Sequence, residues 1–196
     1  MKIYGDLISG NCQKVKYTAD CLGLDYCWVD IDINKGEAKT PEFLAKGPQG
    51  QVPLVEFDDG RTLAQSNAII RYLASGTRLL PQDNFEAAKV DEALFWEQYS
   101  HEPYIAVSRF QMLYTGLSAS QRDDWRVERG DAALDFMDTH LATRTYWCDS
   151  GFSVADISLF AYTRVAHEGG FDLTQRNNVQ RWITSIEKEL RLDDLR

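Results

Sequence analysis

Hydrophobic and polar positions change their spacing near residue 80, and this change divides the chain into two parts. Before it, short segments with the alternation typical of strands are interspersed with segments of helical spacing. After it, only helical spacing occurs. The pattern predicts an α+β domain over residues 1–78, a linker, and an all-helical domain over residues 84–196.

The first domain begins with a strand, a helix and a second strand. A strand is expected at Lys2–Tyr4, and helical spacing follows from Cys12 until Gly23, which is placed as a C-terminal stop. Residues 26–33 then alternate, with Cys27 and every second residue up to Ile33 on one face. This alternation predicts the second strand.

Three local signals complete this domain. Thr40-Pro41 is typical of an N-cap followed by a proline in the first turn, and predicts a helix that ends at Gly47. Two short strands flank Asp58-Asp59-Gly60, a hairpin signal, and Ser66 is expected to cap the last helix. The predicted order is therefore βαβαββα, a mixed sheet covered by helices.

The second part contains the helix signals of a bundle. An amphipathic segment runs over residues 85–113, and Pro103 is expected to bend or interrupt it. Another helical segment covers residues 120–141. Further on, Ser153 and Asp156 form a capping box, and the flanking residues Phe152 and Ile157 occupy the positions of a hydrophobic staple.

Composition and charge exclude several classes of protein. Of 196 residues, 44% are hydrophobic and 26% are charged, as in ordinary globular proteins, so disorder is not expected. The net charge of −9, without any run of Lys and Arg, argues against nucleic-acid binding. No apolar run is long enough for a membrane span, and the first residues lack a secretory signal. The four cysteines show no C-x-x-C spacing and the histidines lie far apart, so we expect no metal site.

Three segments, together with the capping box, resemble the cytosolic glutathione transferase family. Their order and spacing match the glutathione-binding domain of that family. The segments are Leu7-Ile8-Ser9-Gly10-Asn11-Cys12, Gly50-Gln51-Val52-Pro53-Leu54 and Leu63-Ala64-Gln65-Ser66-Asn67-Ala68-Ile69. The resemblance implies a thioredoxin-like N-terminal domain and an all-α helical-bundle domain that contributes a hydrophobic co-substrate pocket. It also implies a cytoplasmic homodimer that uses glutathione and a small hydrophobic electrophile.

The resemblance places Ser9 at the activating position of theta-like bacterial members. There its hydroxyl would donate a hydrogen bond to the glutathione sulfur and favour the thiolate. Two rivals stay open. Cys12 lies in the first turn of a helix, where a thiol can have a lowered pKa and form a mixed disulfide. Tyr4 ends the first strand, the position of the activating tyrosine in other branches of the family.

The other site residues also follow from the resemblance. A cis bond between Val52 and Pro53 would turn the Val52 amide and carbonyl outward, where the cysteinyl backbone of glutathione can pair with them. Ser66 and the first turn of its helix would bind the γ-glutamyl carboxylate. Gln65 could pair with the ammonium or carboxylate of the ligand.

One departure from the family concerns the glycyl carboxylate of glutathione. A histidine or another polar residue often meets this group in the family, but here Ala38 cannot do so. Lys39 and Gln51 are the candidates in its place.

Three functions compete on these residues. The first is a transferase that conjugates glutathione to small hydrophobic electrophiles. The second is a glutathione-dependent peroxidase or thiol-disulfide oxidoreductase that uses the same site. The third is a glutathione- or ligand-binding module without turnover.

Overall fold

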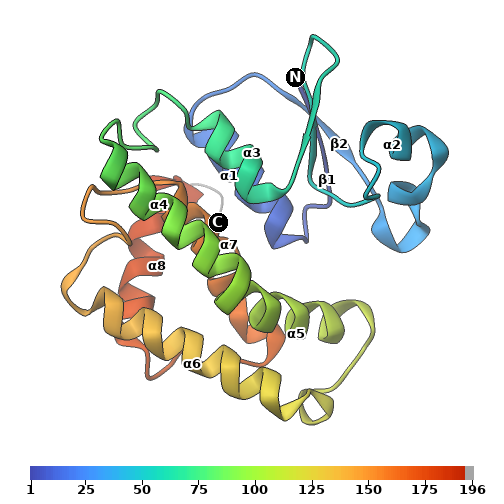
Figure 1. The fold of residues 1–196 in the computed structure, drawn as a ribbon. Coiled ribbons are helices and arrows are strands. Elements are labelled where there is room, and N and C mark those ends of the chain that lie inside the picture. Colours follow the sequence, from blue (N-terminus) through green and yellow to red (C-terminus); the bar gives the residue numbers. More distant parts are fainter. Residues whose placement is uncertain (193–196) are drawn as a thin grey trace. The chain divides into compact units, whose positions relative to one another are not determined.

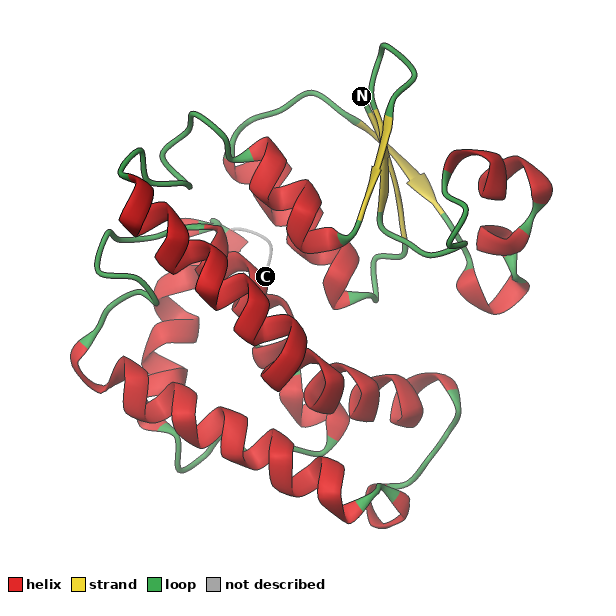
Figure 2. Cartoon of the chain, in the orientation of Figure 1, coloured by secondary structure: helices red, strands yellow, loops and turns green. Residues whose placement is uncertain are grey.

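A computed structural model describes residues 1–192 and divides the chain into two compact units, of which the second begins at Arg78 (Figure 1). Strands occur only in the first unit among the described residues, and helices make up the second (Figure 2). None of the helices within residues 1–192 combines the length and the apolar character that crossing a bilayer requires.

The first unit is built on a four-stranded mixed sheet of order β2-β1-β3-β4. β1 pairs with β2 in parallel and with β3 antiparallel, and β3 and β4 form the hairpin expected around Gly60. The expected thioredoxin-like order βαβαββα is confirmed. Its elements are β1 (Lys2–Gly5), α1 (Gly10–Cys21), β2 (Cys27–Asp30), α2 (Pro41–Lys46), β3 (Leu54–Glu56), β4 (Thr62–Ala64) and α3 (Ser66–Leu73).

Helices lie on both sides of this sheet: α1 and α3 on one side and α2 on the other (Figure 1). Because β1 is central, three of its four residues are buried. On the α2 side, Tyr4 packs edge-on against Phe43 with ring centroids 6.0 Å apart. Val29 and Ile31 pack against the same cluster, as expected of one face of the second strand.

The second strand is shorter than predicted. It ends at Asp30, and residues 33–35 form a 3-10 turn because the Asp32 carboxylate accepts the amides of Asn34 and Lys35. Cys27, the first residue of this edge strand, is exposed.

The helical unit contains five α-helices within the described residues. They are α4 (Asn84–Trp96), α5 (Glu102–Tyr114), α6 (Asp124–His140), α7 (Val154–Thr163) and α8 (Asn177–Glu189). The chain passes from α4 to α5 through a π-helical turn, Glu97–His101. Pro103 is the second residue of α5, and the wider turn before it accommodates a ring that would clash with the preceding carbonyls of an α-helix. The predicted interruption at Pro103 is confirmed.

The capping box at the start of α7 is confirmed, with Ser153 and Asp156 bonding each other's backbone amides. Asp156 is fully buried and also accepts the Trp147 amide at 2.7 Å and Trp182 Nε1 at 2.9 Å. Burial raises the pKa of Asp156 to about 6 despite these bonds. One carboxylate thus joins the loop before α7, α7 itself and α8.

Candidate active site

Ser9 lies between β1 and α1 and is the N-cap of α1, so its side chain sits at the positive end of that helix. Its hydroxyl oxygen accepts the amide of Cys12 at 3.4 Å, and its own amide bonds the carbonyl of Asp6 at 3.1 Å. A hydroxyl has one proton and two lone pairs, so accepting this bond leaves the proton for another acceptor. Ser9 is half-buried, between an exposed loop and the buried start of α1.

Cys12 is fully buried on the inner side of α1. Burial raises the pKa of the Cys12 thiol to about 11, although the Asp6 amide and the Ser9 hydroxyl both favour the thiolate. At neutral pH, Cys12 is therefore a neutral thiol without access to a disulfide partner.

Tyr4 is occupied by a different interaction. Its hydroxyl donates to Oε2 of Glu56 at 2.6 Å, and Lys46 bonds the same carboxylate oxygen at 3.0 Å. The hydrogen bond to Glu56 raises the pKa of Tyr4. Tyr4 is thus a buried sheet residue that ties β1 to β3.

The peptide bond between Val52 and Pro53 is cis, as expected. Val52 is half-buried, and Pro53 is buried at the entrance to β3. Within residues 1–192, neither the amide nor the carbonyl of Val52 bonds another backbone group. An extended ligand backbone would find both groups unused.

Gln65 and Ser66 form the turn from β4 into α3. Gln65 has φ +69°, a conformation that costs energy for a residue with a side chain and that concentrates at functional sites. Its side-chain nitrogen Nε2 donates a hydrogen bond to Oε1 of Gln49 at 2.9 Å. The expectation that Ser66 caps α3 is wrong: the N-cap is Gln65, and Ser66 is the first helical residue. The Ser66 hydroxyl instead donates to Oδ1 of Asn11 at 3.1 Å.

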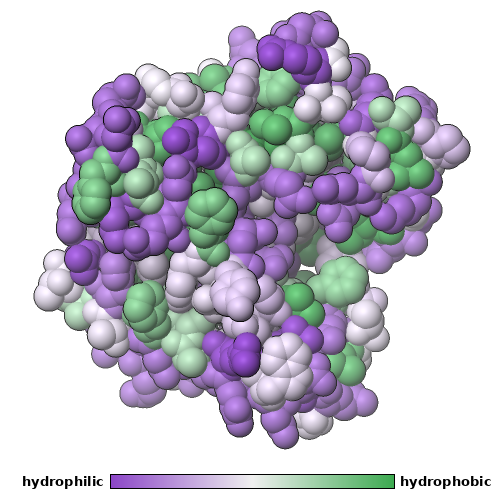
Figure 3. All heavy atoms as spheres, viewed as in Figure 1, coloured by the Kyte–Doolittle hydropathy of each residue, from purple (hydrophilic) through white to green (hydrophobic). Residues whose placement is uncertain are grey.

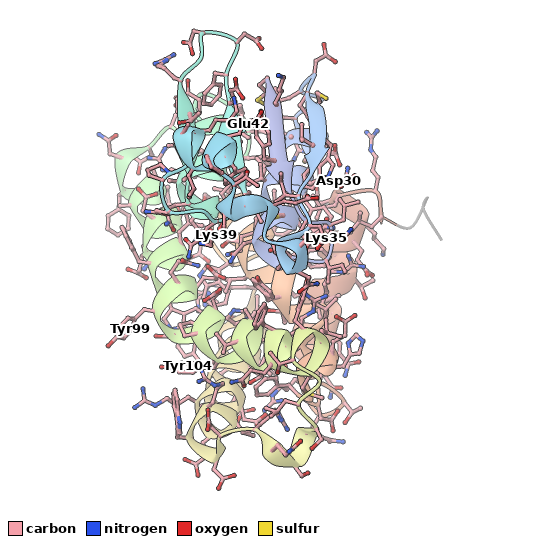
Figure 4. The ribbon with its side chains drawn as sticks, turned by 90° about the vertical axis from the view of Figure 1, so that its right-hand side faces the viewer. Asp30, Lys35, Lys39, Glu42, Tyr99 and Tyr104 are labelled. Carbon is pink, nitrogen blue, oxygen red and sulfur yellow. The ribbon has the colours of Figure 1, made fainter. Side chains whose placement is uncertain are left out.

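Lys39 is an exposed cation on the segment between β2 and α2 (Figure 4). Its ammonium donates to the carbonyl of Gln49 at 3.2 Å. Gly50 makes this approach possible, since a Cβ there would lie 2.8 Å from Nζ of Lys39. Gln51 is exposed in the same loop, whereas Ala38 is buried in the core beside Tyr4.

Two residues that were not expected at the site connect its parts. Gln49 joins the Lys39 ammonium to Gln65, and Asn11 joins the first turn of α1 to Ser66. Asn11 lies within the first motif and Gln49 directly precedes the second, but the sequence does not indicate their hydrogen bonds because their partners are distant along the chain. Through them, Lys39, the loop before β3 and the starts of α3 and α1 form one connected surface of the first unit.

Comparison with known proteins gives matches in both units. Residues 8–75 match the family described as glutathione S-transferase, N-terminal domain, and residues 119–185 match the corresponding C-terminal domain. Glutathione S-transferase 3 of Zea mays is 34% identical over 165 residues, which cover 80% of this chain and 73% of that protein. A solved glutathione S-transferase from Pseudomonas fluorescens is 45% identical with a TM-score of 0.91, covering 95% of this chain and 94% of its own. A structure described as a possible glutathione S-transferase from Rhodopseudomonas palustris is 40% identical with a TM-score of 0.92, covering 96% and 94%.

Proposed function

Because the chain belongs to the glutathione S-transferase family, we propose that its first unit binds glutathione across Ser9, the loop before β3 and the start of α3. The relatives are named as transferases, so the reaction joins the glutathione sulfur to an electrophile. The observation that carries the proposal is the Ser9 hydroxyl at the start of α1. Its oxygen already accepts the Cys12 amide, and its proton can point to a bound sulfur.

Ser9 acts as a donor to a thiolate, and the magnitude of its effect can be bounded. A free thiol of pKa about 8.5 is roughly 3% ionised at pH 7. A hydrogen bond and a helix N-terminus that lower this pKa by about two units raise the ionised fraction to about three quarters. The gain is about 20-fold, less the nucleophilicity lost with basicity. The thiol proton passes to water, and the thiolate sulfur then bonds the electron-poor atom of the electrophile as the leaving group departs with its bonding electron pair, while Ser9 keeps its own proton.

The start of α3 would hold the γ-glutamyl end of glutathione. The first amides of a helix have no partner within it and carry partial positive charge, which favours a carboxylate. Ser66 is the first residue of this helix and Gln65 is its N-cap. The Ser66 hydroxyl would bond the carboxylate, and the Gln65 amide would bond the ammonium or the carboxylate.

The remainder of the tripeptide would lie along the loop before β3. The unused amide and carbonyl of Val52, before the cis bond to Pro53, would pair with the cysteinyl backbone. Lys39, held beside this loop by the Gln49 carbonyl, would bind the glycyl carboxylate, with Gln51 as a neutral partner. In a protein of net charge −9, this lysine offsets the repulsion of an anionic ligand.

A small hydrophobic electrophile fits the aromatic character of the helical unit. On α5, Phe110 and Tyr114 stack with ring centroids 4.9 Å apart, and Leu113 is exposed beside them. Planar apolar compounds pack well against such a pair.

We also propose a homodimer in the cytoplasm. On the surface of the helical unit, α4 and the turn after it expose Phe85, Phe95 and Tyr99, whose exposed fractions are 70%, 76% and 82%. Figure 3 shows one face of the molecule, on which hydrophobic and hydrophilic groups are interspersed. A second copy would cover such side chains. The four cysteines, all within the described residues, form no disulfide with one another, as in a reducing compartment.

Retention on glutathione-agarose, followed by turnover with a panel of model electrophiles and hydroperoxides, tests the function. Conjugation that depends on Ser9 is the expected result. Retention without any turnover would favour a binding module. Peroxide turnover that survives Ser9→Ala and is lost in Cys12→Ala would favour the oxidoreductase.

A further inference from the structure

The hydrogen bond between Ser66 and Asn11 joins the first turns of two helices that are 55 residues apart in sequence. Asn11 is the second residue of α1, two positions after Ser9, and Ser66 opens α3. Ser66 is 6% exposed as a residue, so most of its surface is in contact with protein groups. The partner of that hydroxyl is therefore set by the protein.

The direction of this bond conflicts with the role proposed for Ser66. A serine hydroxyl has a single proton, and here it is given to Oδ1 of Asn11. The γ-glutamyl carboxylate has only acceptor oxygens, so it needs that same proton. While Ser66 donates to Asn11, it cannot donate to the carboxylate.

An asparagine side chain resolves the conflict without moving the backbone. Its terminal amide has an acceptor oxygen on one side and a donor nitrogen on the other, and rotation by half a turn exchanges them. After rotation, Nδ2 of Asn11 donates a hydrogen bond to Oγ of Ser66. The Ser66 hydroxyl, still protonated, can then donate its own hydrogen bond to the carboxylate. The hydroxyl is then satisfied both with ligand and without it.

We propose that Asn11 is a positioning residue for the γ-glutamyl carboxylate, and that its amide turns from acceptor to donor towards Ser66 when glutathione binds. The proposal rests on the proposed function, because it assigns the regulation of the same site. It makes Asn11 a determinant of affinity for the carboxylate rather than of the reactivity of the sulfur. An ionised aspartate, which has nearly the same size, would accept but not donate, and the smaller alanine would do neither.

The test measures binding of glutathione and of an analogue without the γ-glutamyl α-carboxylate, γ-aminobutyryl-cysteinyl-glycine, by calorimetry. The variants are Asn11→Ala, Ser66→Ala and the double variant, with Asn84→Ala on α4 as the matched control. We expect Asn11→Ala to weaken glutathione about tenfold, as for one bond to a charged group. Ser66→Ala should weaken it at least as much, and the double variant should equal Ser66→Ala. The analogue should bind the wild type and all four variants within about twofold of one another.

A second readout separates positioning from general damage to the fold. With an electrophile that the wild type conjugates, Asn11→Ala should raise KM for glutathione and leave kcat near that of the wild type, because only carboxylate binding changes. A loss that is equal for glutathione and the analogue, or that adds fully to the loss in Ser66→Ala, overturns the role of Asn11.

The outcomes also distinguish the inference from the function beneath it. If the wild type prefers glutathione to the analogue and Ser66→Ala removes this preference, the assignment of Ser66 stands. Unchanged binding by Asn11→Ala then overturns only the inference. If the wild type binds both ligands equally, the assignment of Ser66 fails and the inference fails with it. Asn11→Asp that binds glutathione as tightly as the wild type would overturn the donor role of Asn11.

Discussion

The hydroxyl oxygen of Ser9 accepts the amide of Cys12 at 3.4 Å while the Cys12 thiol itself is fully buried. Two groups that sulfur chemistry could use thus lie three residues apart in different environments. The N-cap of α1 presents a half-buried hydroxyl, and the inner side of α1 buries a thiol whose pKa is raised by burial to about 11. The geometry favours a serine that assists the thiol of a bound ligand over a cysteine that reacts itself.

Replacement of Ser9 by alanine tests the donor role. We expect kcat/KM for conjugation at pH 7 to fall about 5- to 20-fold, because the thiolate is no longer stabilised. The loss should shrink as the pH rises towards the pKa of free glutathione. The loss of the N-cap should also lower the free energy of unfolding by about 1 kcal/mol. Steady-state rates between pH 6 and 9, with thermal unfolding in parallel, measure both effects.

Ser153→Ala is a suitable control for Ser9→Ala, since it removes another N-cap, that of α7 in the helical unit. It should reduce stability without changing the pH profile of kcat/KM. A Ser9→Ala enzyme with the pH profile of the wild type would contradict the donor role.

Replacement of Cys12 by alanine tests the competing chemistry. Conjugation should stay within about twofold of the wild type, because the buried thiol does not contact the ligand. The free energy of unfolding should fall by about 1 kcal/mol through the loss of packing. Rates with electrophiles and with hydroperoxides, measured on the same preparation, check the expectation. A selective loss of hydroperoxide or disulfide reduction would show that Cys12 reacts.

Alanine substitutions at Gly50 and Gly60 distinguish the effect of backbone strain from the effect of a disturbed Lys39. Gly50→Ala places a Cβ 2.8 Å from Nζ of Lys39 and 2.9 Å from the carbonyl oxygen of Ala38, at φ +60°. It should lower the free energy of unfolding by about 2 kcal/mol and weaken glutathione binding severalfold. Gly60→Ala has φ +83° but no atom within 4 Å of the added Cβ. This control should cost about 1 kcal/mol and leave binding unchanged. Equal affinity for glutathione in the two variants would argue against Lys39 as a ligand.

Asp156 gives the helical unit a pH dependence of defined sign. Its pKa is about 6 in the folded chain because of burial, whereas an unfolded aspartate titrates near pH 4. Between these values the folded chain binds a proton that the unfolded chain does not, so this group stabilises the fold as the pH falls from 7 to 5. Relative to Asp156→Asn, the wild type should gain about 1 kcal/mol over this range. Urea unfolding of both proteins at pH 7 and pH 5 measures the difference.

If the free energy of unfolding of the wild type fell, relative to Asp156→Asn, between pH 7 and pH 5, the folded chain would favour the ionised carboxylate. Asp156→Ala is a further check, since it leaves the buried Trp147 amide and Trp182 indole N–H without their common acceptor. It should cost at least about 3 kcal/mol at pH 7.

The elements with local determinants could be predicted from the sequence. Thr40 and Pro41 start α2, Ser153 and Asp156 start α7, and the turn at Gly60 joins two strands. Each depends on side chains within a few residues of the backbone groups that they satisfy. The early end of β2 was missed because the Asp32 carboxylate turns the chain out of the strand pattern.

The connections within the candidate site could not be predicted in the same way. The pairing of Ser66 with Asn11 spans 55 residues, and that of Gln65 with Gln49 spans 16. Such contacts depend on the packing of α1 on α3 and on the path of the loop before β3. The periodicity of hydrophobic residues along the chain does not predict them. The resemblance to a family located the loops, and the structure identified their partners.

The most direct test of the account is the acidity of glutathione bound to the protein. Titration of the complex by the ultraviolet absorbance of the thiolate, in the wild type and in Ser9→Ala, measures it. We expect the wild type to lower the thiol pKa from about 8.5 by about two units, and Ser9→Ala to restore most of that difference. A bound thiol as weakly acidic as in free solution, or equally acidic in both proteins, would contradict the claim that Ser9 stabilises the thiolate.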